Sequence, residues 1–201
     1  TDVSGVFSAD PRGVPGARRL QRVSFEEMLE MAATGGRVLA LRSVEFARNH
    51  GVPLHVRSSF TWEPGTWVGE EEVSMEDPVI SGVTHDTAEA KVTIDKVPDQ
   101  PGIAARVFRA LADAAVNVDM IEQNVATGGL TDISFTVPRD DLPAALAVIE
   151  KIVPEIGAAT FDHDAEIGRV SLNGAGMRSN PGVAATMFET LAAEGINIEM
   201  I

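Results

Sequence analysis

Two Pro-Gly steps, at 101–102 and 181–182, are the positions in this sequence best suited to binding a small charged molecule. Each is predicted to stand at the start of a helix, where free backbone N–H groups and the helix dipole favour a carboxylate or a phosphate. Asp99 lies just before the first step and offers a carboxylate to an ammonium group. The two features together suit a free amino acid. Taken alone, a Pro-Gly step favours the simpler interpretation that it only starts a helix.

A second group of charged residues lies in the turn-rich segment 1–23, which begins TDVSGVFSADPR. Its glycines and prolines interrupt regular structure. Arg12 and its neighbouring arginines suit phosphate, and Asp2 suits a ribose or a base. A nucleotide-contacting loop is therefore one interpretation of the segment. On spacing alone, an ordinary solvated surface loop is favoured.

Composition excludes several kinds of site and partner. The chain has 201 residues and a formal net charge of -14, which argues against nucleic acid or an anionic membrane as partner. The absence of cysteine excludes disulfides, thiolate metal sites and a cysteine nucleophile. The four histidines are not spaced as metal ligands, so no protein metal site is expected. No signal peptide or membrane-length apolar run is found, which favours the cytoplasm; because Thr1 is not a natural start, a lost signal stays open.

The elements that must position the Pro-Gly steps occur twice in the chain. From Pro101 and Pro181 onward, two copies align without a gap and are identical at ten of twenty-one positions. Each copy predicts a strand, a loop, a helix and a second strand that alternates apolar and polar residues. Pro101 is expected at the first position of its helix, and Asn180 is expected to cap the second helix. A period this long suits two tandem small domains.

The part before the repeats predicts the end of a larger α/β domain. A capping box at Ser24 opens a helix, and a second helix over 38–49 and a strand over 53–58 follow. Two helices and one strand cannot close a core alone. The acidic, Gly-containing segment 63–74 is then expected to be a linker.

The first copy with its following residues predicts a β-α-β-β-α-β unit over 91–161, the split βαβ pattern. The second copy supplies only β-α-β. A further strand over 79–84 is surplus to the first set, so it is expected to pair with the second unit.

The chain resembles a known family. Six segments carry the resemblance: TDVSGVFSADPR (1–12), SFEEMLEMAATGGRVL (24–39), VPLHVRSSF (52–60), DQPGIAARVFRALADAAVNVDMIEQNV (99–125), TDISFT (131–136) and VSLNGAGMRSNPGVAA (170–185). The repeats resemble ACT domains, which are amino-acid-sensing modules. The whole chain resembles aspartate kinases (aspartokinases) of the actinobacterial type, and the match is collinear over essentially its full length.

The implied fold is α+β and α/β: the C-terminal piece of an amino-acid-kinase α/β domain, followed by two ferredoxin-like ACT units of which the second is incomplete. The implied boundaries are 1–68 for the kinase part, 69–78 for a linker, 79–90 for a strand of the second ACT unit, 91–157 for the first ACT unit and 158–201 for the second.

The resemblance also implies an activity, the ATP-dependent phosphorylation of L-aspartate to 4-phospho-L-aspartate, with Mg²⁺ accompanying ATP. This is the first step toward lysine, threonine and methionine. Lysine, threonine or both are implied as feedback effectors, and a homodimer or an α2β2 assembly through the ACT units is implied as the oligomer. The family's aspartate-binding residues have no counterpart here, so no catalytic residue is assigned. The 201-residue chain alone is expected to be inactive.

By the same resemblance, the nucleotide site comprises Thr1, Asp2, Phe7, Arg12 and Arg37. Phe7 stands where many members of the family carry tyrosine, so a hydroxyl contact is lost. Arg37 replaces a phosphate-contacting lysine, which keeps the charge but exchanges a compact ammonium for a planar fork.

The implied effector residues are Asp99, Gly102 and Ala104 around the first Pro-Gly step, Asp119, Gln123 and Asn124 in the strand beyond it, and Asn197 and Ile198 from the second unit. In the family such sites lie between the two ACT units across a dimer interface. Ala126 stands where many relatives carry serine, so a hydroxyl contact is absent. Strand-edge packing is the alternative interpretation, and the resemblance disfavours it for Asp99, Gln123 and Asn197 only.

Two other functions deserve comparison with a feedback-regulated kinase. One is a stand-alone amino-acid-binding regulatory subunit without catalytic activity, and Met75 stands where such a subunit of the family would begin. The segment TDVSGVFSADPR favours the kinase, because a pure sensor has no use for it. The other, a nucleic-acid-binding ferredoxin-like domain, fails on charge and on an aromatic content of 5%.

Overall fold

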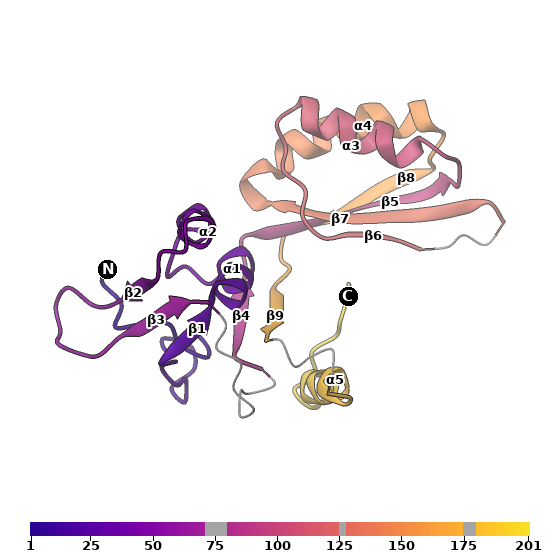
Figure 1. Cartoon of the computed structure of the whole chain (residues 1–201). Coiled ribbons are helices and arrows are strands. Elements are labelled where there is room, and N and C mark those ends of the chain that lie inside the picture. Colours follow the sequence, from indigo (N-terminus) through magenta and orange to yellow (C-terminus); the bar gives the residue numbers. More distant parts are fainter. Residues whose placement is uncertain (71–79, 125–127, 175–179) are drawn as a thin grey trace. The chain divides into compact units, whose positions relative to one another are not determined.

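A computed structural model of the chain describes residues 1–70, 80–124, 128–174 and 180–201 (Figure 1). The chain divides into two compact units. Unit 1 consists of residues 1–86 and 170–197, and unit 2 consists of residues 87–169 and 198–201. Along the described chain, no helix is long and apolar enough to cross a membrane.

The kinase-like part of unit 1 is built on a sheet of three short strands. Strand β3 (Thr66–Gly69) lies in the centre, with β1 (Arg22–Ser24) parallel to it and β2 (Leu54–Val56) antiparallel. Helices α1 (Phe25–Ala33) and α2 (Leu41–Asn49) pack against each other and contribute apolar residues to one core with the sheet. The fully buried members of that core include Phe25, Met28, Val44 and Val68.

Two strands of this sheet differ from the sequence-based expectation. The segment 63–74 was expected to be a linker, but its residues 66–69 form the central strand, so the linker expected over 69–78 begins inside a strand. Likewise, β1 lies in a segment expected to be turns. Both strands are only three or four residues long and follow turn residues, so their alternation is too short to outweigh the turn signals. Residues 71–79, which hold the remainder of the expected linker, lie outside the described residues.

The capping box at the start of α1 is confirmed. The Ser24 hydroxyl accepts a hydrogen bond from the Glu27 N–H at 3.1 Å, and the Glu27 carboxylate accepts from the Ser24 N–H at 3.0 Å. Both bonds satisfy N–H groups that a helix start leaves without partners within the helix.

We expect Ser24→Ala to lower the free energy of unfolding of unit 1 by about 1 kcal/mol, because the cap is lost. Ser43→Ala, at an exposed position in the first turn of α2, is the matched control and should change it by less than about 0.5 kcal/mol. Urea unfolding followed by tryptophan fluorescence suits the measurement, because both tryptophans, Trp62 and Trp67, belong to unit 1. Equal losses in the two variants would contradict a special role for the cap.

The remainder of unit 1 belongs to the second repeat. Strand β4 (Gly82–Asp86) pairs with β9 (Arg169–Asn173), and helix α5 (Val183–Ala193) follows. The strand expected over 79–84 is thus observed two to three residues later, and its partner is the strand that opens the second repeat, as the surplus-strand argument predicts. Val79 itself lies outside the described residues.

Helix α5 keeps its apolar side chains accessible, in contrast to its counterpart in the first repeat. No residue of α5 is buried, and Met187 and Leu191 line an apolar groove with residues of β4 and β9. Their counterparts Val107 and Leu111 are fully buried. Within the described residues, the apolar side chains of the second repeat's helix are therefore less buried than those of the first repeat's helix.

Unit 2 has the β-α-β-β-α-β order expected for a ferredoxin-like ACT domain. Its elements are β5 (Glu89–Pro98), α3 (Ile103–Asp113), β6 (Ile121–Gln123), β7 (Leu130–Pro138), the 3₁₀ turn η1 (Arg139–Asp141), α4 (Leu142–Ile156) and β8 (Thr160–Asp164). The antiparallel sheet has the order β6-β7-β5-β8, and α3 and α4 cover one of its faces (Figure 1).

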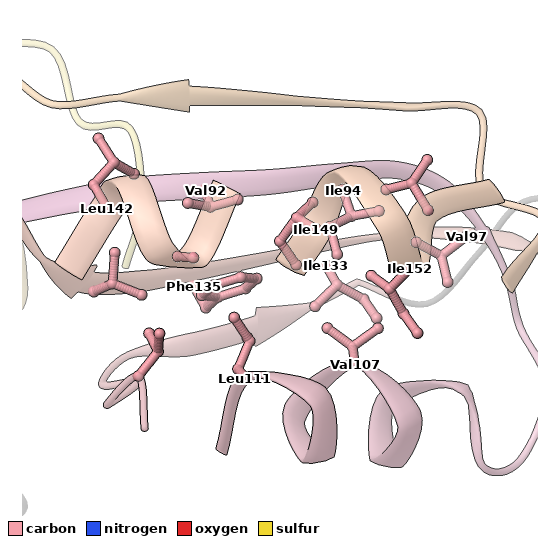
Figure 2. Close-up of a cluster of buried hydrophobic side chains, with 14 of the residues drawn as sticks. Val92, Ile94, Val97, Val107, Leu111, Ile133, Phe135, Leu142, Ile149 and Ile152 are labelled. Atoms are coloured by element: carbon pink, nitrogen blue, oxygen red, sulfur yellow. The ribbon is translucent and has the colours of Figure 1, made fainter. Parts of the chain in front are cut away.

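The core of unit 2 lies between this sheet and the two helices. Strand residues such as Ile94, Ile133 and Phe135 meet helix residues such as Leu111 and Ile149, all essentially inaccessible to solvent (Figure 2). Phe135 also makes an edge-to-face contact with Phe108, with ring centroids 5.6 Å apart. The alternation of the strands and the helical stripe of α3 thus converge on one apolar layer.

Three details of the repeats were predicted wrongly. Strand β8 pairs with β5, so the first unit continues to Asp164 and the boundary expected at 157 falls too early. Helix α3 begins at Ile103 with Gly102 as its N-cap at φ 94°, rather than at Pro101. The cap of α5 is Gly182 at φ 101°, rather than Asn180. Glycine reaches this left-handed backbone region without steric cost, so each Pro-Gly step forms the turn before its helix.

Candidate functional site

The residues expected to bind nucleotide all lie in unit 1, and four of them come from its first segment. That first segment, residues 1–23, is hydrogen-bonded to the sheet and to the loop after β2. The Val6 N–H donates to the buried Thr66 hydroxyl at 2.8 Å, and the Ser59 N–H donates to the Thr1 carbonyl at 2.8 Å. The backbone of Phe7 forms an isolated antiparallel β-bridge with that of Arg19. The fold of the segment is therefore fixed, while the side chains of Asp2 and Arg12 remain exposed.

Arg12 is held by a neighbour that the sequence did not single out. The guanidinium donates to both carboxylate oxygens of Asp10, with an Nη2–Oδ2 distance of 2.8 Å, and the Arg12 N–H also donates to Asp10 at 2.9 Å. These hydrogen bonds lower the pKa of Asp10 from its ordinary 3.8 to about 2. Asp10 thus stays ionised and fixes one edge of the guanidinium, whose side chain is 86% exposed.

We expect an NMR titration of the Asp10 carboxylate to give a pKa of about 2, with Arg12→Gln returning it toward 3.8. The folded value lies below the unfolded one, so the stabilisation from this pair is present above pH 3.8 and is lost as the pH falls through about 2. Arg18→Gln, in the same segment, should leave the Asp10 pKa unchanged. An unshifted Asp10 in the unsubstituted protein would show that the ion pair does not persist in solution.

Arg37, the fifth expected nucleotide residue, lies in the connection between α1 and α2. Its side chain is 78% exposed, and its guanidinium lies 3.9 Å from the carboxylate of Asp86 at the end of β4. A nearby contact joins β4 to the first segment directly, since the Val83 N–H donates to the Ser8 carbonyl at 2.8 Å. Strand β4, which pairs with the second repeat, therefore contacts Arg37 and the segment 1–23 that carries the other four expected nucleotide residues.

The first three expected effector residues lie together in unit 2. Asp99 is exposed, and its N–H donates to the Gly129 carbonyl at 2.9 Å, which fixes the loop before α3. Gly102 caps α3 without a side-chain hydrogen bond, and the space where a side chain would stand is open. Ala104 lies in the first helical turn. The exposed carboxylate and the accessible helix start are the two features that the sequence suggested for an amino acid.

Of the next three residues, Gln123 ends strand β6, which pairs with β7, and Asp119 and Asn124 lie just before and just after that strand. Asp119 donates its N–H to the Thr136 carbonyl at 3.0 Å, Gln123 lies opposite Ile133, and the Asn124 carbonyl accepts from the Thr131 hydroxyl. The Asp119 carboxylate is hydrogen-bonded by Arg169.

Arg169 is a residue that sequence reasoning missed. The signal that could have found it is the repeat itself, because Arg169 and Lys91 are the first residues of the two repeat copies. Asn197 belongs to unit 1 and Ile198 to unit 2, and both are exposed. Ala126 and Met75 lie outside the described residues. Within the part of the chain that is described, no cluster of three acidic or histidine side chains suited to a metal ion is found.

Family models match three parts of the chain. Residues 1–58 match the amino acid kinase family, residues 91–154 match the ACT domain, and residues 170–201 match a second ACT domain model. The regulatory subunit of aspartate kinase from Thermus thermophilus, a solved structure, is 41% identical over 62% of this chain and 82% of that subunit, with a TM-score of 0.58. The chain belongs to the aspartokinase family.

Aspartokinases also match over the whole chain. The aspartokinase of Mycobacterium tuberculosis is 58% identical over 205 aligned residues, which are all of this chain and 49% of the relative. The chain thus spans about half the length of the curated aspartokinases it matches. Aspartokinase III of Escherichia coli, solved with aspartate and ADP, matches with a TM-score of 0.82 at 25% identity, over all of this chain and 44% of that chain. The same enzyme was also solved with lysine and aspartate, with a TM-score of 0.73 and 26% identity over the same shares.

Proposed function

We propose that the complete protein containing this chain is an aspartate kinase, which transfers a phosphoryl group from ATP to the side-chain carboxylate of L-aspartate and yields 4-phospho-L-aspartate. The observation that carries the proposal is the collinear match to aspartokinases over the whole chain, across both the kinase part and the ACT repeats. No residue of this chain is assigned to binding aspartate.

The role of this chain in catalysis is then to hold the nucleotide. Thr1 and Asp2 would contact the nucleoside, Phe7 would lie against the base, and Arg12 and Arg37 would contact the phosphates. Two exposed guanidinium groups fit phosphate oxygens. Mg²⁺ would enter with ATP and neutralise charge that develops on the phosphates. Asp10 holds the Nε edge of Arg12 and leaves the opposite edge of the fork for a phosphate.

Arg12→Gln in the complete protein should raise KM for ATP about tenfold, because one charge-assisted hydrogen bond to phosphate is lost. Arg18→Gln removes the same charge from an exposed position in the same segment and should leave KM within about twofold. Formation of aspartyl hydroxamate at varied ATP concentrations provides the measurement. An unchanged KM in Arg12→Gln would remove Arg12 from the nucleotide site.

The ACT units are proposed to bind lysine, threonine or both as feedback effectors. The N–H groups at the start of α3 would receive the α-carboxylate, and Asp99 would receive the α-ammonium group. Asp119, Gln123 and Asn124 would line the site, and Asn197 and Ile198 would come from a second unit across a dimer or α2β2 interface. The lysine complex of E. coli aspartokinase III supports the choice of ligand class. A cytoplasmic location is proposed with this metabolic role.

A second candidate function is a regulatory subunit without catalytic activity. It is favoured by one observation, the 82% coverage of the Thermus thermophilus regulatory subunit. The kinase is preferred because residues 1–58 match the amino acid kinase family and their first segment is fastened onto the β1-β3-β2 sheet. We also propose the domain boundaries given above, with the kinase part extended through Gly69, the first ACT unit extended through Asp164 and the second unit starting at residue 165.

A further inference from the structure

Two ion pairs in unit 2 are related to each other by the internal repeat. Arg169 is hydrogen-bonded to the carboxylate of Asp119, and the ammonium group of Lys91 lies 2.6 Å from the carboxylate of Glu199. Lys91 and Arg169 are the first residues of the two repeat copies, which begin KVTID and RVSLN. Asp119 and Glu199 hold the same position in VNVDMI and INIEMI. The acidic residue of each copy is therefore paired with the basic residue of the other copy.

The ion pair of Arg169 is the more buried of the two at its basic residue, since the Arg169 side chain is 11% exposed and the Lys91 side chain is 20% exposed. The side chains of Arg169 and Glu89 are each 11% exposed, and Arg169 Nη2 lies 3.8 Å from Glu89 Oε1. The second Glu89 carboxylate oxygen is buried and has no hydrogen-bond donor among the residues that the structure describes. A buried carboxylate needs a cation beside it, so Glu89 holds the guanidinium in place. Arg169 is thus fixed on its Glu89 side and reaches Asp119, whose side chain is 56% exposed.

We infer that Arg169 is a built-in cation occupying the carboxylate of Asp119, and that the side-chain ammonium group of lysine, whose α-ammonium group is assigned to Asp99, binds there only by displacing it. The inference rests on the effector site proposed above. An ammonium group and a guanidinium repel each other when they share one carboxylate. The affinity for lysine is therefore lowered by the free energy that is needed to break the Arg169–Asp119 ion pair first.

Arg169 lies where the chain passes from unit 2 into strand β9, so its displacement affects the start of that strand. Arg169 is the last residue of unit 2 before the chain passes into unit 1, and it is also the first residue of β9. Strand β9 pairs with β4, which is hydrogen-bonded to the first segment through Ser8. Release of Arg169 from Asp119 frees one anchor of the strand that leads toward the proposed nucleotide site.

The test is calorimetric titration of the complete protein with lysine, and with threonine as the comparison ligand that has no side-chain ammonium group. Arg169→Gln should tighten binding of lysine about tenfold, because Asp119 becomes available without competition. Asp119→Asn should weaken it about tenfold, and the double variant should resemble Asp119→Asn. A merely structural ion pair predicts the same direction for both single variants. Arg48→Gln, which removes an exposed arginine paired with Glu26 in unit 1, is the control and should bind normally.

Because Arg169→Gln leaves Glu89 buried without its cation, the variant Glu89→Gln/Arg169→Gln is measured beside it and thermal melting checks both. The double replacement leaves Asp119 equally free and should show the same tightening. Unchanged or weaker binding in the folded variants would overturn the displacement. If the unsubstituted protein does not bind lysine, the inference fails, and if it binds neither amino acid, the effector site itself fails as well.

Discussion

Phe135→Ala is expected to lower the free energy of unfolding of unit 2 by about 3–5 kcal/mol. Phe135 is fully buried on β7, and its ring lies between the sheet and both helices (Figure 2). Truncation removes the contact with Phe108 and leaves a cavity lined by side chains that a packed sheet and two helices hold in place. A loss of this size approaches the whole stability of many small domains.

The matched control is Phe60→Ala in unit 1, because Phe60 is 82% exposed. It should change the free energy of unfolding by less than about 0.5 kcal/mol. Circular dichroism in urea is suitable for unit 2, since both tryptophans of the chain report on unit 1. A loss below about 1 kcal/mol for Phe135→Ala would contradict the central place of this ring in the core.

Asp99→Ala is expected to weaken effector binding to the complete protein by about tenfold to a hundredfold, which corresponds to about 1.5–3 kcal/mol for one charge-assisted hydrogen bond. The Asp99 side chain is exposed beside the start of α3, where helix N–H groups favour a carboxylate. An amino acid bound with its carboxylate at the helix would present its ammonium group to Asp99. Calorimetry with lysine and threonine measures the effect.

Asp113→Ala is the control for this change. Asp113 is an exposed carboxylate at the far end of the same helix, so its removal alters the net charge equally but leaves the helix start intact. Its effector affinity should stay within about twofold of the unsubstituted protein. Equal affinities in Asp99→Ala and the unsubstituted protein would remove Asp99 from the site.

The fold of unit 2 could be predicted from the sequence, because its apolar–polar alternation in the strands and its apolar spacing in the helices extend over many residues and indicate the same fold. The alternation of Val92 and Ile94, and of Ile133 and Phe135, places each pair on the same face of the sheet, and all four are buried. The short strands β1 and β3 could not be predicted in this way. Val68 becomes a core residue only because β1 and β2 lie on either side of it, and that arrangement is not encoded in four residues.

The candidate sites divide in a similar way. The local features, Asp99 before a helix start and Arg12 in an exposed turn, follow from neighbouring residues. The contact of Arg169 with Asp119 joins residues 50 positions apart, so it depends on the tertiary fold. The alignment of the two repeats shows that each has one basic and one acidic residue at these positions. Only the folded structure shows that Lys91 pairs with Glu199 and that Arg169 pairs with Asp119.

The most direct test of a feedback-regulated aspartate kinase is ATP-dependent formation of aspartyl hydroxamate by the complete protein, with and without lysine and threonine. We predict turnover that is inhibited by lysine, by threonine or by the pair together. In Asp99→Ala, expressed as a fraction of that variant's own uninhibited rate, the same inhibition should require about ten to a hundred times more effector. Absence of ATP-dependent turnover with aspartate, or turnover that neither amino acid alters, would contradict the account.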